Sequence, residues 1–101
     1  MLFGNKIRTL RDEQGVLQRQ LAAYLEIDTP MFSKIERGDR RAKRSQVIML
    51  AEYFHVDEKE MLTLWFADKI LDALEGENEL GLDAIETAKS KLTDILPKVS
   101  R

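Results

Sequence analysis

The chain has 101 residues, of which 44% are hydrophobic and 34% are charged, so we expect one compact domain or one domain with an appendage. This charge content, without an apolar run near the roughly 18 residues of a spanning helix, excludes a membrane protein. The absence of cysteine excludes disulfides and thiolate zinc sites, and the single histidine, His55, leaves little material for a metal site. Because the first residues also lack the apolar segment of a signal peptide, we expect a cytoplasmic protein without a cofactor.

Apolar residues recur at intervals of three and four along the whole chain, and no run alternates as a strand would, so the sequence predicts an all-α fold. The expected helices cover residues 3–14, 18–25, 29–37, 46–54, 58–74 and 82–96. Gly15 and Gly38 are natural stops for the first and third of these helices. Asp28 and Ser45 are the expected N-caps of the third and fourth helices.

Charge is distributed unevenly, although the net charge is only −2. Residues 1–44 carry ten Lys and Arg against six Asp and Glu, whereas residues 45–101 carry six against twelve. This asymmetry indicates a basic face for an anionic partner and an acidic part held away from it. Chance clustering of charge on a solvated surface is the alternative.

Residues 18–37 carry the main functional signal, because two short helices with a tight turn between them must pack at a steep angle. Ala22 supplies the small residue that such a crossing needs. The apolar residues at inward-facing spacings are Leu21, Leu25, Ile27, Phe32 and Ile35. The second helix then presents its N-terminal half outward, where it can enter a major groove about 12 Å wide.

Three segments resemble the phage-repressor/Cro-type (XRE-like) helix-turn-helix family: Ile7–Arg11, Leu17–Ala22 and Phe32–Gly38. The resemblance covers about residues 3–64 and implies a five-helix repressor-like DNA-binding domain over residues 1–64, followed by a C-terminal helical extension over residues 65–101. The family consists mainly of dimeric bacterial and phage transcriptional regulators, with some antitoxins and restriction–modification controllers.

Three positions depart from the family pattern. Glu26 stands where the family usually has a turn glycine, and a positive φ there would cost about 1 kcal/mol. Leu17 stands where a Ser or Thr N-cap is usual, so the helix from Gln18 is expected to be less well capped. Pro30 occupies a position that often carries a base-reading side chain, and proline cannot donate a hydrogen bond.

The base-contact candidates lie on the third helix, and they are Thr29, Pro30, Met31 and Lys34, with Lys34 one turn into the helix. Lys34 can donate to guanine O6 and N7, Thr29 can bond a base or a phosphate, and the other two can touch thymine methyls. The alternatives are a phosphate contact or plain solvation for Lys34, a helix-start role for Thr29, and exposed or partly packed surface for Pro30 and Met31.

The phosphate-contact candidates are mostly cations near the third helix. They are Gln18, Arg19, Ser33, Arg37, Arg40, Arg41, Lys43 and Arg44. Gln18 opens its helix, where backbone N–H groups favour an anion, and Arg41 or Arg44 can enter a narrowed minor groove. The family resemblance also implies an ion pair between Arg11 and Glu36, which would lock the first helix to the third and keep an acidic group from repelling phosphate.

The C-terminal extension combines apolar stripes with an acidic surface. Its candidate dimerisation residues are Trp65, Phe66, Ile70, Leu74, Ile85, Leu92 and Ile95, and Val99 continues the stripe of the last helix. Each large apolar side chain that is buried contributes roughly 1.5–3 kcal/mol, so these stripes require cover. The last helix can fold back on the helix before it within one chain, or it can pair with a second chain. We expect a homodimer, because two half-sites one helical turn apart, ~34 Å, give affinity and specificity.

These observations favour a transcriptional repressor that binds a palindromic operator on double-stranded DNA as a homodimer. The alternatives are the antitoxin of a toxin–antitoxin pair and a restriction–modification controller, in which the acidic C-terminal helices receive a second protein. The sequence contains no nucleophile–base pair, phosphate loop or metal cluster, so we do not expect an enzyme.

Overall fold

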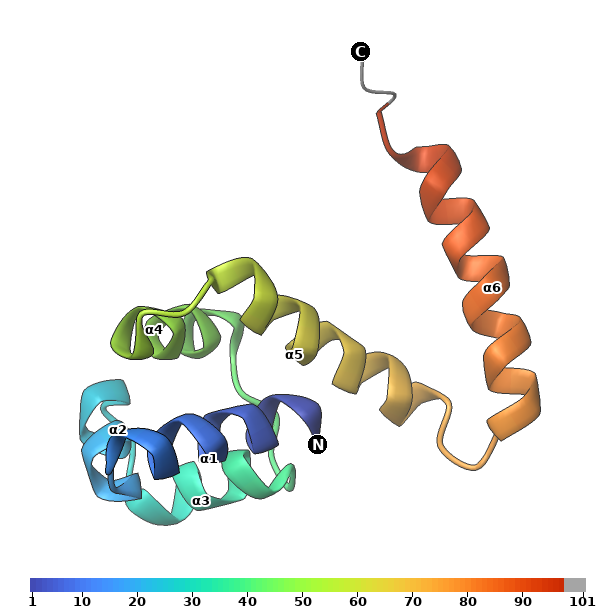
Figure 1. Ribbon diagram of the computed structural model, residues 1–101. Helices are drawn as coiled ribbons and strands as arrows, with labels where there is room; N and C mark the ends of the chain where they lie inside the picture. The colour runs from blue at the N-terminus through green and yellow to red at the C-terminus, as the bar shows by residue number, and fades with distance from the viewer. Residues whose placement is uncertain (98–101) are drawn as a thin grey trace. The chain divides into compact units, whose positions relative to one another are not determined.

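The computed structural model describes residues 1–97, and within them it contains six helices and no strand (Figure 1). The helices are α1 (Leu2–Gln14), α2 (Gln18–Leu25), α3 (Thr29–Arg37), α4 (Arg44–Phe54), α5 (Glu58–Ala73) and α6 (Asn78–Ile95). The prediction of an all-α fold is confirmed. Val99, assigned above to the last apolar stripe, lies outside the described residues.

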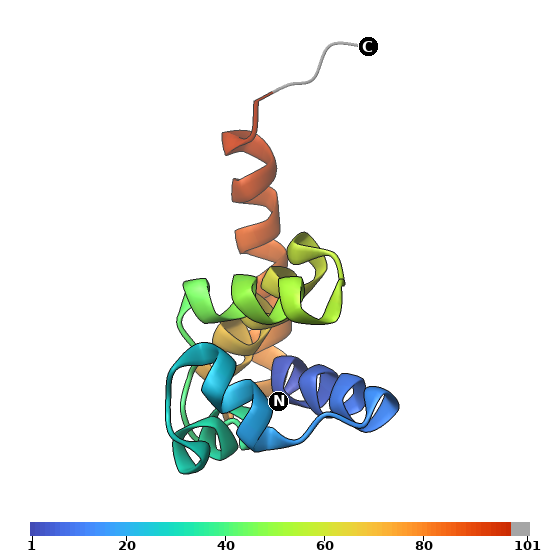
Figure 2. The same cartoon turned by 90° about the vertical axis from the view of Figure 1, so that its left-hand side faces the viewer.

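The chain divides into two compact units, Met1–Ile70 and Leu71–Arg101, and the boundary between them falls inside α5. In the first unit α3 packs against α1 and α2, and α2 also contacts α4 (Figure 2). The core contains sixteen buried hydrophobic side chains, which begin at Phe3 and end at Trp65. The inward-facing residues of the helix-turn-helix, Leu21, Phe32 and Ile35, all belong to this core.

The turn between α2 and α3 follows the expected geometry. Glu26 has φ 59° and ψ 42°, so a glutamate adopts the left-handed conformation that glycine would occupy without strain. The Asp28 side chain accepts a hydrogen bond from the Met31 N–H at 2.7 Å and caps α3. Leu17 cannot cap α2, but the Gln20 Oε1 accepts from the Leu17 N–H at 2.7 Å. This bond supplies half of a capping box.

Two helix starts differ from the sequence prediction. The expectation that Ser45 caps α4 is wrong, because the helix begins at Arg44 and the Gln46 Oε1 accepts from the Lys43 N–H at 2.8 Å. The last helix begins at Asn78 rather than at residue 82. Gly76, with φ 81°, turns the chain after α5, and α6 begins two residues later. Glu79 lies in the first turn of α6, where an acidic side chain stabilises the helix.

The first turn of α1 is held by two contacts from distant parts of the chain. The buried Asp68 carboxylate on α5 accepts from the Leu2 N–H at 2.8 Å and from the Phe3 N–H at 3.0 Å, so it caps a helix that it does not belong to. A Cβ added at Gly4 would lie 2.1 Å from the Glu36 backbone oxygen, so only glycine permits this approach of α1 to α3.

In the second unit, Gly81 is buried and packs beside the Leu74 side chain, whereas the other described residues of α6 are exposed. Among the described residues, none of the helices is both long and apolar enough to span a bilayer.

Candidate nucleic-acid interface

Helix α3 presents its N-terminal half to solvent. Thr29, Pro30 and Lys34 are exposed, and Met31 and Ser33 are half-buried. Pro30 lies in the first turn, where its missing N–H leaves no helical bond unmade. Part of Met31 packs on the core, so this side chain offers less surface to a ligand than its neighbours do.

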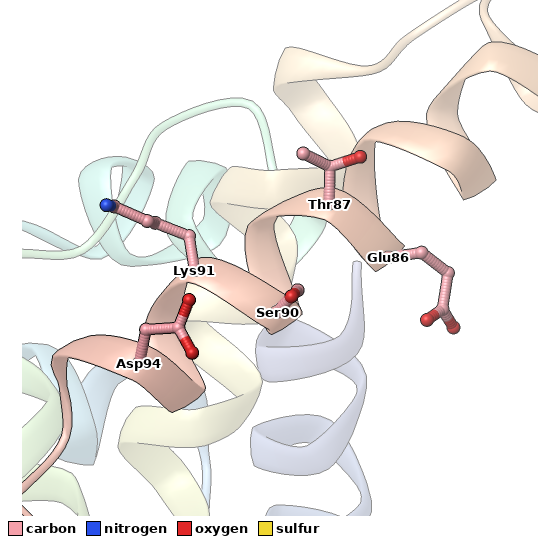
Figure 3. A pocket seen from close by; sticks show the side chains of 5 residues that line it. All are labelled: Glu86, Thr87, Ser90, Lys91 and Asp94. Carbon is pink, nitrogen blue, oxygen red and sulfur yellow. The ribbon is translucent and has the colours of Figure 1, made fainter.

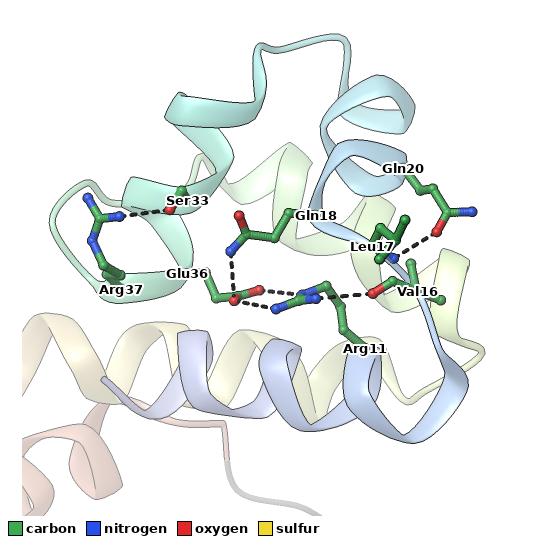
Figure 4. Close-up of polar contacts among 8 residues, drawn as sticks. All are labelled: Arg11, Val16, Leu17, Gln18, Gln20, Ser33, Glu36 and Arg37. Carbon is green, nitrogen blue, oxygen red and sulfur yellow. Dashed lines mark hydrogen bonds and ion pairs between the residues drawn. The ribbon is translucent and has the colours of Figure 1, made fainter.

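Glu36 joins α1, α2 and α3 through a network of side-chain hydrogen bonds (Figure 4). The Arg11 guanidinium donates to both carboxylate oxygens, each at 2.7 Å, and this is the pair expected from the sequence. Arg11 also donates to the Val16 carbonyl at 3.1 Å, which ties the end of α1 to the turn before α2. The Gln18 Nε2 donates to the Glu36 Oε1 at 3.0 Å.

This hydrogen-bond network favours the charged forms of Glu36 and Arg11. Burial opposes the charged form of Glu36, but hydrogen bonds from Arg11 and Gln18 and the nearby cations outweigh it and hold the pKa of Glu36 below its usual value. The Glu36 carboxylate in turn raises the pKa of Arg11. The charge of Glu36, near the C-terminal end of α3, is therefore balanced by Arg11, and the residue is only 8% exposed, so it does not repel a phosphate at the surface.

Arg37 orders the end of α3 (Figure 4). Its NH1 donates to the Ser33 Oγ at 2.7 Å, and its Nε donates to the Asp39 Oδ2 at 3.0 Å. The Ser33 hydroxyl oxygen accepts this hydrogen bond from the Arg37 guanidinium. The hydroxyl proton is not used in that bond and can be donated to an anion. Both Arg37 and Asp39 are well exposed, so their ion pair contributes little to stability.

The loop from residue 39 to residue 43 brings several cations beside α3. Arg40, Arg41, Lys43 and Arg44 are exposed, whereas Ala42 between them is buried. The Trp65 Nε1 donates to the Ala42 carbonyl at 2.8 Å and anchors the loop to α5. Met31 and Ile35 of α3 line a hollow together with Arg40 and Lys43. Arg19 is exposed on α2.

The structure separates the candidate dimerisation residues into buried and exposed groups. Trp65 is 7% exposed and is hydrogen-bonded within its own chain, so it offers little surface to a second chain and belongs to the core. Phe66 and Ile70 are exposed on α5, and Ile85, Leu92 and Ile95 are exposed on α6. Leu74 is half-buried against Gly81.

Several positioning residues were missed by the sequence analysis. Asp68 is the clearest, and it carried a signal, because spacings of four and three place it on the same α5 face as the buried Met61 and Trp65. An acidic residue in a buried stripe indicates a polar partner. The role of Gly4 carried no comparable signal, because the approach of α1 to α3 is a tertiary property.

One open hollow lies along α6, and its lining includes Glu86, Ser90 and Lys91 (Figure 3). Across residues 1–97 no three His, Cys, Asp or Glu side chains are grouped in a way that could hold a metal ion.

Comparison with known families gives a match to the helix-turn-helix domain over residues 2–64. Comparisons with curated proteins and with solved structures gave no significant match. The matched segment takes in all of α1 to α4 and the beginning of α5, including the network around Glu36 and the exposed half of α3. The chain therefore belongs to the helix-turn-helix domain family, which points to a DNA-binding regulator.

Proposed function

We propose that this protein is a sequence-specific transcriptional repressor of the phage-repressor/Cro type (XRE-like) that binds a palindromic operator as a homodimer. The observation that carries the proposal is the surface of α3. Its N-terminal half is exposed beside a run of cations, while the acidic Glu36 in its C-terminal half is withdrawn into an ion pair. Such a surface fits a helix that enters the major groove between two phosphate backbones.

Base reading falls to four residues at the start of α3. The exposed Lys34 donates to guanine O6 and N7, and Thr29 bonds a base edge or the adjoining phosphate. Pro30 and Met31 supply apolar contacts, for which the thymine methyl group is the matching feature of the major groove. The expected operator half-site therefore contains both a G·C pair and a thymine within reach of one helical turn.

Phosphate contacts surround this reading surface on two sides. Gln18 is held by Glu36 at the N-terminus of α2, with one amide proton left for a phosphate, and the exposed Arg19 follows it. On the other side, the DNA backbone is contacted by the Ser33 and Arg37 pair. It is also contacted by the cations between α3 and the start of α4, which are Arg40, Arg41, Lys43 and Arg44.

The homodimer is supported by the exposed apolar residues of α5 and α6, which include Phe66, Ile70, Leu92 and Ile95. The alternative function is an antitoxin or a restriction–modification controller that offers this region to another protein. The acidic character of residues 71–97, with seven acidic and two basic side chains, favours that alternative if the partner is basic.

Fluorescence anisotropy tests the proposal with DNA from upstream of the protein's own gene, against a scrambled duplex of equal length, at about 50 and about 200 mM salt. We expect the upstream duplex to bind at least roughly tenfold more tightly than the scramble at the higher salt, with affinity for both falling steeply as salt rises. Equal affinity for the two duplexes contradicts sequence-specific binding. Binding to neither contradicts the DNA-binding role and directs attention to a protein partner.

Lys34→Ala, measured beside Lys59→Ala, tests the assignment of the reading surface. Both lysines are exposed, but Lys59 lies in the first turn of α5, away from α3. We expect Lys34→Ala to weaken binding to the upstream duplex by about 1–3 kcal/mol and to reduce discrimination against the scramble. Lys59→Ala should leave the affinity for the upstream duplex and the discrimination against the scramble unchanged. An equal effect of the two substitutions would show that Lys34 contributes only general charge.

A further inference from the structure

Two exposed apolar surfaces of opposite charge lie next to each other in the sequence. The first, which we call the cationic ridge, consists of Phe66, Lys69 and Ile70 on α5. Phe66 and Ile70 are 43% and 50% exposed. The Lys69 ammonium lies 3.7 Å from the centroid of the Trp65 ring and 5.3 Å from that of Phe66, and the Arg44 guanidinium lies 5.8 Å from the Phe66 centroid. The ridge thus presents an aromatic and an aliphatic side chain bordered by two cations.

The second surface is a hollow at the turn between α5 and α6, which we call the acidic hollow. Its apolar lining comes from both helices, with Leu71 and Leu74 from one side and Leu82 and Ile85 from the other. Glu75 and Glu77 also line it, and both are exposed. Leu71 and Leu82 remain more than half exposed, so the described chain leaves the apolar lining of the hollow open.

The two surfaces complement each other, because one is a ridge with positive charge and the other is a hollow with negative charge. An apolar ridge bordered by cations fits an apolar hollow bordered by carboxylates, and each lacks the cover that apolar surface requires. Residues 66–73 form one continuous stretch of α5. A helix cannot fold its own ridge into a hollow that begins one residue further along its own axis. A second molecule can supply the ridge that fills the hollow.

We propose that the cationic ridge of one copy occupies the acidic hollow of a second copy, and that the reverse contact forms at the same time. The C-terminal halves of two α5 helices then lie antiparallel across a twofold axis near residue 72. Lys69 of each copy faces the partner's Glu75. This arrangement is isologous, since the same patch serves on both molecules. It rests on the proposed homodimer and identifies the surface that forms it.

Charge reversal tests this interface by sedimentation velocity on the full chain. Lys69→Glu and Glu75→Lys should each weaken the dimer on the order of tenfold or more, because each places like charges opposite one another at both contacts. The double variant that carries both substitutions in one chain should regain the dimer. Lys59→Glu, on the same helix outside the ridge, is the matched control and should leave the dimer Kd unchanged.

Mixing the two single variants shows whether the ion pair forms between chains. In a heterodimer of Lys69→Glu with Glu75→Lys, one contact keeps the native pair and the other has the reversed pair, so both contacts are attractive. We expect an equimolar mixture to dimerise more tightly than either variant alone. A pair formed within one chain would give no such recovery, and that result would overturn the proposal.

The apolar part of the interface is tested by Ile70→Asn against Leu92→Asn. Both residues are at least half exposed, but Leu92 lies on α6 outside the hollow. We expect Ile70→Asn to raise the dimer Kd more than Leu92→Asn does. The opposite order, or a monomeric wild-type chain at micromolar concentration, would overturn the proposed interface. The DNA assay above is an independent test. A wild-type monomer that still bound the upstream duplex would contradict this interface but not the proposed DNA binding.

Discussion

Glu36 illustrates how a single residue is adapted to its place in a helix that we propose faces DNA. An acidic group in α3 would repel phosphate if it were exposed, but the Arg11 guanidinium and the Gln18 amide both donate to its carboxylate. The same bonds connect three helices, so the residue that avoids repulsion also stabilises the motif. Gln18 joins this network to the proposed phosphate site at the start of α2.

Glu36→Gln should lower the free energy of unfolding by about 2–3 kcal/mol near neutral pH, because Arg11 would remain charged and nearly buried without its partner. Burial opposes ionisation, yet the bonds from Arg11 and Gln18 leave the pKa of folded Glu36 below that of the unfolded chain. This contribution to stability is therefore present above the unfolded value of about 4.3 and is lost as the pH falls through the lower, folded value.

Denaturant unfolding at about pH 7 and about pH 3 measures this dependence, with the exposed Glu13→Gln as the control. The difference between wild type and Glu36→Gln should shrink at the lower pH, while Glu13→Gln should stay within about 0.5 kcal/mol of wild type at both. A difference that did not change with pH would show that Glu36 stabilises the fold by packing rather than by charge.

At the scale of elements, the packing of α1 on α3 depends on the absence of a side chain at Gly4. Gly4→Ala should destabilise the domain by about 1–3 kcal/mol, since the new Cβ would meet the Glu36 backbone oxygen and the helices would have to separate. Alanine is otherwise the better helix former by about 1 kcal/mol, so helix propensity alone predicts the opposite sign.

Thermal unfolding of Gly4→Ala beside Asn5→Ala measures this effect, because Asn5 is exposed on the next position of the same helix. Asn5→Ala should be neutral or slightly stabilising. Equal stabilisation by both substitutions would mean that α1 and α3 are not in close contact at this point.

The elements themselves were largely predictable from the sequence, because apolar spacing and stop residues are local signals. The helix starts were less predictable. Gln46 rather than Ser45 supplies the oxygen that completes the start of α4, and α6 begins four residues early because the chain needs only the turn around Gly76. A cap depends on which of several polar residues the backbone brings within reach, and periodicity does not determine that choice.

The site was predictable where the helix-turn-helix spacing applied and less so beyond it. The pattern of α3 separates buried Phe32 and Ile35 from exposed Thr29 and Lys34, as the spacing predicts. The sequence predicts Trp65 either in the core or at a dimer interface, because the expected domain ends before it. In the structure the indole anchors the loop at Ala42, a contact that joins residues 23 positions apart and leaves no mark in local periodicity.

At the scale of the whole molecule, stability is concentrated in the first unit. All sixteen buried hydrophobic residues lie between Phe3 and Trp65, and Asp68 binds the start of α1. A fragment of residues 1–70 keeps every one of these contacts. A fragment of residues 1–64, which corresponds to the family match, loses both Trp65 and Asp68.

Thermal unfolding of the two fragments, followed by circular dichroism, should therefore separate them. We expect the fragment of residues 1–70 to unfold cooperatively with a Tm within a few degrees of the full chain. The fragment of residues 1–64 should be less stable by about 3–5 kcal/mol, because removing the buried indole opens the core and also frees the Ala42 carbonyl. If the shorter fragment matched the longer one, α5 would stabilise the DNA-binding unit only up to residue 64. If residues 1–70 failed to fold, the first unit would depend on the rest of the chain for its stability.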